Sequence, residues 1–65
     1  MILPDREHMQ RMGWTHQVEY RAGNFPCFQR FKTAAAADHL ADILKRDKNV
    51  SDVVVIDLVE AMRVN

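Results

Sequence analysis

The feature that most constrains the fold is an aliphatic run near the end of the chain, VVVIDLV at residues 53–59. A strand with one buried face alternates apolar with polar side chains, and this run does so only at Asp57. The run therefore predicts a strand that is buried on both faces. A chain of 65 residues buries only about 60% of its surface on folding, so it has few elements with which to cover a second face.

Two further strands are expected before this run. Residues 14–22, WTHQVEYRA, alternate between two faces, with Trp14, Val18 and Tyr20 on the same one. The segment FPCFQRFKT at residues 25–33 is the expected return strand after a Gly-Asn turn, because both turn residues tolerate positive φ. The two segments predict a β-hairpin whose Trp14 row faces the core.

The return strand contains a proline. Pro26 cannot donate a hydrogen bond to a ladder, so we expect this strand at the edge of the sheet or with a bulge near its start. Without a bulge, Cys27 shares the face of Phe31, and Phe28 lies on the opposite face with Arg30. A bulge would exchange Cys27 and Phe28, so the sequence leaves open which of the two is buried.

A helix is the strongest local prediction. Thr33 is a suitable N-cap for AAAADHLADILKRDKN at residues 34–49, and alanine is the residue that most favours helix. The expected buried stripe consists of Ala36, Ala37, Leu40, Ile43 and Leu44. A right-handed crossover through this helix makes the third strand parallel to the second, and the first strand then lies between them, antiparallel to both.

The predicted fold class is α+β, with a ββαβ order, a mainly antiparallel three-stranded sheet of order 2-1-3, and one long helix on one face. Residues 13–65 form this single domain, and residues 60–65 are a frayed strand end or a tail. Residues 1–12 are expected to form an N-terminal arm or a short helix, with Pro4 in its first turn and Gly13 at its end. The second face of the sheet is expected to be covered by this arm, by a second copy of the chain, or by another protein.

Composition narrows the class of protein. Nine basic and nine acidic residues give a formal net charge of zero, without the basic excess typical of nucleic-acid binders. Cys27 is the single cysteine, so no disulfide forms within the chain, as expected in a reducing compartment. The sequence shows neither the pattern of a signal peptide nor an apolar run of about 20 residues. We therefore expect a soluble, cytoplasmic protein with no membrane contact.

Few residues suggest chemistry. The soft metal ligands His8, His16, His39 and Cys27 are each expected on a different element and lack metal-site spacing. The two glycines do not form a phosphate-binding loop. We expect no catalytic, metal-binding or cofactor-binding residue, no cofactor and no small-molecule substrate, and therefore a protein that is not an enzyme.

Association with another protein, or with a second copy as a homodimer, is the leading functional expectation, because a long apolar edge strand invites strand addition. The predicted contact surface points away from the helix and consists of Phe28, Val54, Ile56 and Leu58. The alternative is a nucleic-acid site on the outer face of the hairpin, beside Phe28, built from Arg21, Arg30 and Lys32. Glu19 on that face and the neutral total charge favour the protein partner.

Three short segments carry a resemblance to known proteins. They are the aromatic start of the first strand at Trp14, FKT at residues 31–33 capping AADHLADIL at 36–44, and SDVVVID at 51–57. The arrangement resembles a class of tiny proteins encoded by bacteriophages and by bacteria near mobile elements. The resemblance implies a strand–strand–helix–strand fold and a role in binding, and modulating or inhibiting, a larger host protein complex. It assigns no functional residue, because fold alone does not give function.

Overall fold

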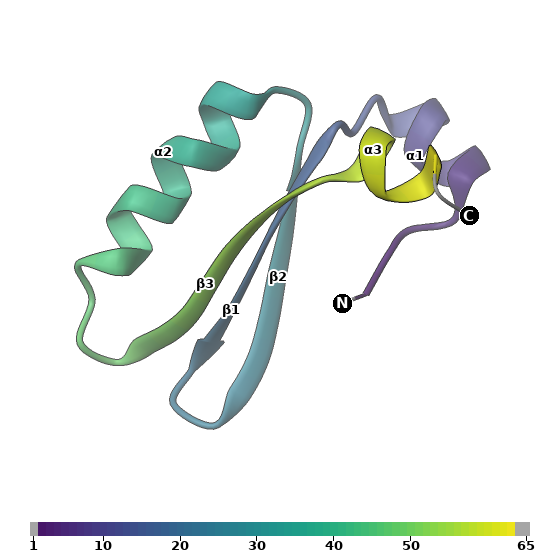
Figure 1. Ribbon diagram of the computed structural model, residues 1–65. Helices are drawn as coiled ribbons and strands as arrows, with labels where there is room; N and C mark the ends of the chain where they lie inside the picture. The colour runs from purple at the N-terminus through teal and green to yellow at the C-terminus, as the bar shows by residue number, and fades with distance from the viewer. Residues whose placement is uncertain (1, 64–65) are drawn as a thin grey trace.

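A three-stranded antiparallel sheet separates one long helix from two short ones (Figure 1). The computed structural model describes residues 2–63; residue 1 of the expected arm and residues 64–65 of the expected tail lie outside this range. In chain order the elements are α1 (Arg6–Met12), β1 (His16–Ala22), β2 (Phe25–Phe31), α2 (Ala34–Lys45), β3 (Val50–Asp57) and α3 (Leu58–Arg63). The strand order β2-β1-β3, with both pairs antiparallel, confirms the predicted α+β class and ββαβ topology.

The β1–β2 hairpin has an uninterrupted register, from His16 opposite Phe31 to Ala22 opposite Phe25. A bulge near Pro26 is therefore absent from the ladder, and β2 accommodates its proline by lying at the edge of the sheet. Cys27 lies opposite Tyr20 and is half-buried. Phe28 lies on the other face and remains exposed, so of the two residues that the sequence left open, Cys27 is the more buried.

β3 carries an irregularity in its pairing with β1. Glu19 lies opposite Val54 and Arg21 opposite Ser51, so three steps along β3 match two steps along β1. This is the geometry of a β-bulge, in which the extra residue increases the local twist. Asp52, inside the bulge, has a φ of 56°, a left-handed conformation that aspartate adopts more readily than a β-branched residue.

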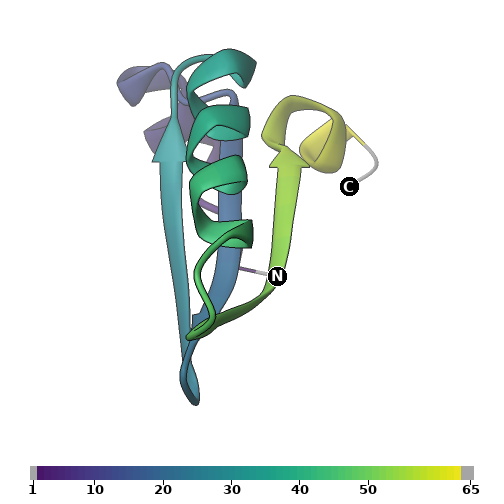
Figure 2. The same cartoon turned by 90° about the vertical axis from the view of Figure 1, so that its left-hand side faces the viewer.

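α2 covers one face of the sheet (Figure 2). Its N-cap is Thr33, as predicted, and the Thr33 hydroxyl accepts a hydrogen bond of 3.1 Å from Ala36 N. The helix buries Ala37 and Ala41 against Val18, which is also fully buried. The partly buried side chains around them are Tyr20, Phe31, Leu40, Leu44, Val53 and Val55.

The buried stripe of α2 differs from the predicted one. Ala36 and Ile43 lie exposed, and Ala41 takes their place beside Ala37 and Leu44. Ala37 and Ala41 lie four residues apart on one face of the helix, and this face packs against the sheet. The bulkier Ile43 lies outside the contact. Ile43 is left 50% exposed on α2.

A second, smaller core lies on the opposite face of the sheet, at the end where β1 begins and β3 ends. Its buried members are Met9 of α1 and Leu58 and Met62 of α3, and Leu3, Trp14 and Ile56 pack against them. Trp14 was expected in the row that faces α2. It belongs to this second core because it precedes the first residue of β1, so the strand alternation does not govern its direction.

The third strand ends two residues earlier than the aliphatic run predicts. It ends at Asp57, and Leu58 and Val59 begin the helix α3. Asp57 Oδ1 accepts a hydrogen bond of 3.1 Å from Glu60 N, which satisfies one of the free N–H groups at a helix start. The expectation that residues 58–59 continue the strand, and that a frayed strand end or a tail follows from residue 60, is wrong for residues 58–63, which form α3. The helix begins here because Asp57 caps it, and this ends the strand within the aliphatic run.

Candidate functional site

The structure divides the predicted contact residues between the surface and the core. Phe28 and Val54 are 39% and 51% exposed on the face opposite α2. Ile56 is half-buried against the second core, and Leu58 is a fully buried member of it. The structure therefore corrects the predicted surface: Leu58 is inaccessible to a partner because α3 turns it under α1, and Ile56 is largely occupied by the same packing.

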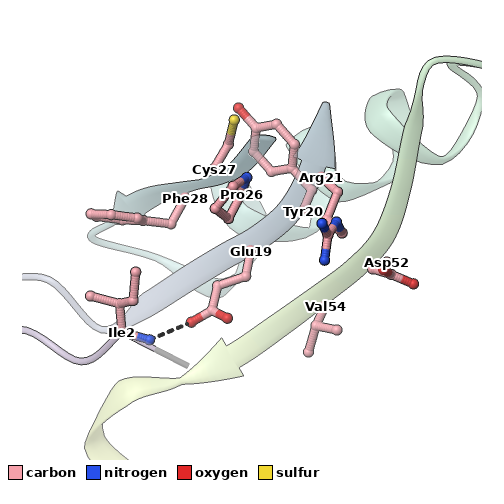
Figure 3. A pocket seen from close by; sticks show the side chains of 9 residues that line it. All are labelled: Ile2, Glu19, Tyr20, Arg21, Pro26, Cys27, Phe28, Asp52 and Val54. Carbon is pink, nitrogen blue, oxygen red and sulfur yellow. Dashed lines mark hydrogen bonds between the residues drawn. The ribbon is translucent and has the colours of Figure 1, made fainter. Parts of the chain in front are cut away.

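A hollow of about 300 Å³ lies beside Phe28 and Val54 (Figure 3). Its apolar rim includes Ile2, which is 54% exposed and comes from the segment ahead of α1. Its charged lining residues are Glu19, Arg21 and Asp52. The hollow therefore combines exposed apolar side chains from three separate segments with charged groups between them.

The N-terminal segment is held against this face by side chains of β1. Ile2 N donates a hydrogen bond of 3.0 Å to Glu19 Oε2, and Ile2 O accepts one of 2.6 Å from Gln17 Nε2. Gln17 Nε2 also donates to Glu19 Oε2 at 2.8 Å. Both backbone groups of Ile2 are thus bound by neighbouring residues of one strand, which fixes the rim of the hollow.

Arg30 forms a second fixed group on the same face. Its guanidinium carbon lies 4.6 Å from the centre of the Phe28 ring and 5.2 Å from that of Trp14. The Trp14 ring in turn lies 5.0 Å from the ring of His8, tilted by 47°. Contacts of a guanidinium with two aromatic rings are favourable, and they hold Phe28 in place at the edge of the hollow.

The three basic residues of the alternative nucleic-acid site do not form a continuous patch along β1 and β2. Arg30 lies opposite Gln17, Arg21 lies opposite Pro26, and Glu19 occupies the position between them on this face of β1. Arg30 is half-buried, and Lys32 follows the last residue of β2 and is exposed. The arrangement places a carboxylate where a phosphate backbone would require positive charge.

The possible metal ligands remain scattered. Within residues 2–63, no group of three His, Cys, Asp or Glu side chains is close enough to hold a metal ion. The ring of His16 is hydrogen-bonded through Nδ1 to the hydroxyl of Thr15 at 2.8 Å. Over the same range, no helix has the length and apolar character that crossing a membrane requires.

Comparisons of the chain with protein-family models, curated proteins and solved structures found no significant match. The candidate site therefore rests on geometry alone. Sequence reasoning placed Phe28 and Val54 on this face and offered the arm, including Ile2, as one of its possible covers. Leu3 and Met9 of that arm do pack on one end of the face. The exposed position of Ile2 beside Val54 was not predicted, since it depends on hydrogen bonds to β1 residues far along the chain. No local sequence signal identifies that contact.

Proposed function

We propose that this chain is a small, non-enzymatic protein-binding module, which contacts a larger intracellular protein through the hollow rimmed by Ile2, Phe28 and Val54. The observation that carries the proposal is that these three apolar side chains remain exposed around one hollow in a domain too small to leave apolar surface uncovered without cost. Interfaces depend on a few such anchors, surrounded by polar groups.

The rigidity of the rim supports the proposal. Phe28 is stacked on Arg30, and Ile2 is held through its backbone by Gln17 and Glu19. Side chains that are already ordered lose little conformational entropy when a partner covers them, so more of their burial energy contributes to affinity. Covering a side chain such as Val54 contributes about 1.5–3 kcal/mol.

The resemblance to phage-encoded proteins directs the choice of partner. Some proteins of that class bind and inhibit one host protein, so a bacterial cytoplasmic extract is the first source to search. In this proposal the chain modulates or blocks its partner by binding and performs no reaction of its own.

The test is affinity capture with the whole chain and two matched variants. Val54→Asp places a charge at the hollow, and Ile43→Asp places the same charge on α2, on the other side of the sheet. The two wild-type side chains are equally accessible, at 51% and 50% exposed. A captured protein that is purified and titrated should bind Val54→Asp at least about tenfold more weakly than wild type and bind Ile43→Asp unchanged.

Two outcomes contradict this proposal. A partner that is lost with Ile43→Asp and retained with Val54→Asp would move the binding surface to α2. A partner that is a nucleic acid, with affinity that falls steeply as salt rises, would favour the basic residues Arg21, Arg30 and Lys32 instead. Circular dichroism of both variants checks that each is folded before binding is compared.

A further inference from the structure

We infer that the partner contributes an extended segment, with alternating apolar and basic residues, which adds to the outer edge of β3 as a fourth strand. The inference deepens the proposed function and rests on it, since it names the kind of segment that the hollow and its neighbouring strand receive. It is argued from the pairing of β3, the position of Val54, and the charges along this edge.

Within residues 2–63, β3 is an edge strand, with no other strand on its outer side. The sheet order places it beside β1 alone, and α3 follows it only at its end, after Asp57. An edge strand presents unpaired N–H and C=O groups, to which an extended peptide can add. The bulge at Val53 and Asp52 disturbs one half of the strand, so the regular part available for pairing runs from Val54 to Asp57.

Val54 belongs both to this edge and to the rim of the hollow. Side chains of neighbouring strands that lie side by side point to the same face of a sheet. A residue paired with Val54 in an added strand would therefore point to the face of the hollow, while its neighbours along the strand point to the face of α2. One segment thus makes backbone hydrogen bonds and covers an apolar anchor at once.

The charge of the edge decides between possible occupants. β3 carries Asp52 and Asp57 and no basic residue. Glu60, which follows in α3, is ion-paired with Arg63 at 3.5 Å and adds little to this charge. Pairing of β3 with a second copy would bring two such acidic edges together without a counter-charge, which opposes self-association. A segment whose apolar residues cover Val54 and whose alternating Lys or Arg lies beside Asp57, on the face of α2, would complement this charge instead.

The experiment is selection of random linear peptides, displayed on phage particles, against the immobilised whole chain. Enriched peptides should alternate apolar residues with Lys or Arg. A synthetic copy of the most enriched peptide should bind Asp57→Asn about two- to fivefold more weakly, since exposed ion pairs contribute modestly. Asn is the chosen replacement because it keeps an acceptor oxygen for Glu60 N at the start of α3 while it removes the charge.

Strand addition is tested separately by N-methylation of alternate amides on one edge of that peptide. The methylated peptide should lose at least about tenfold in affinity, because each missing backbone hydrogen bond contributes on the order of 1 kcal/mol. Amide exchange of the chain should slow along β3 when the unmodified peptide is bound. Full affinity after methylation would overturn the inference. Slowed amide exchange along β2 in place of β3 would overturn it as well.

The two proposals fail in distinguishable ways. If the peptides lose affinity for Val54→Asp but tolerate methylation, the hollow is still supported as a binding site, and the addition of a fourth strand is contradicted. Enrichment of acidic or helix-forming peptides, or no enrichment, also overturns it, whatever protein the capture experiment finds. A dimer in light scattering that Val54→Asp dissociates would show that a second copy occupies this edge.

Discussion

Gln17 is fully buried, and its Oε1 accepts a hydrogen bond of 2.8 Å from Nε of Arg30, which lies opposite it on β2. Its Nε2 donates to Ile2 O and to Glu19 Oε2. The donors and the acceptor of this side-chain amide are therefore all used, and one buried glutamine links the N-terminal segment, β1 and β2. Burial of a polar side chain is tolerated because each of its polar groups has a partner.

Replacing Gln17 with methionine tests this link. The variant Gln17→Met keeps a similar side-chain size but leaves Ile2 O and Arg30 Nε without their partners. We expect it to lower the free energy of unfolding by about 1–3 kcal/mol, measured by urea denaturation. The matched control is Gln29→Met, since Gln29 is exposed and donates only a longer bond of 3.3 Å to the Tyr20 hydroxyl. Equal stability of the two variants would contradict the role given to Gln17.

Leu58 and Val59 are neighbours in α3 with opposite environments, at 0% and 54% exposed. Leu58→Ala should destabilise the chain by about 2–5 kcal/mol, because it opens a cavity in the second core. Val59→Ala should change the free energy of unfolding by at most about 0.5 kcal/mol. Thermal unfolding of both variants makes the comparison. If residues 58–59 continued β3 as the sequence predicted, Leu58 would be exposed, and Leu58→Ala would cost little stability.

Asp57 acts as the N-terminal cap of α3 through its bond to Glu60 N. Asp57→Ala should cost about 1 kcal/mol in urea denaturation, the usual effect of losing a cap. Asp57→Asn retains an acceptor oxygen, so it should recover most of that stability. A loss of the same size in both variants would assign the effect to charge instead of to the cap.

Because Asp52 has a left-handed conformation, glycine and valine at this position should have different effects on stability. Asp52→Gly should leave stability unchanged or raise it slightly, because glycine adopts a positive φ without a steric penalty. Asp52→Val should lower the free energy of unfolding by about 1–3 kcal/mol, since a β-branched residue is strained at this φ. Stability of Asp52→Val equal to that of Asp52→Gly would argue against the bulge.

The sheet and α2 could be predicted because their signals are local and agree with one another. Alternation in β1, the Gly-Asn turn and the Thr33 cap each specify one element, and the handedness of the crossover then fixes the strand order. The end of β3 could not be predicted from hydropathy. An aliphatic run fits a buried strand and a buried helix equally well, and the capping signal at Asp57 decided between them.

The candidate site was predictable only in part, for a different reason. The facing of Phe28 and Val54 follows from strand periodicity, which the sequence contains. The burial of Gln17 and the position of Ile2 depend on contacts between distant segments, and a polar residue on a short strand is ordinarily expected in solvent. Leu58 was predicted at the surface but lies in the second core, because in the helix α3 its side chain points toward Met9 and Met62.

The attachment of Ile2 to Gln17 and Glu19 has a practical consequence for laboratory work on this chain. A purification tag or fluorescent protein joined ahead of Ile2 would begin at the rim of the hollow and compete with whatever binds there. The last described helix, α3, is the alternative side for a fusion, since none of its residues lines the hollow. Binding measured with the two fusions should therefore differ, and only the second reports on the unobstructed surface.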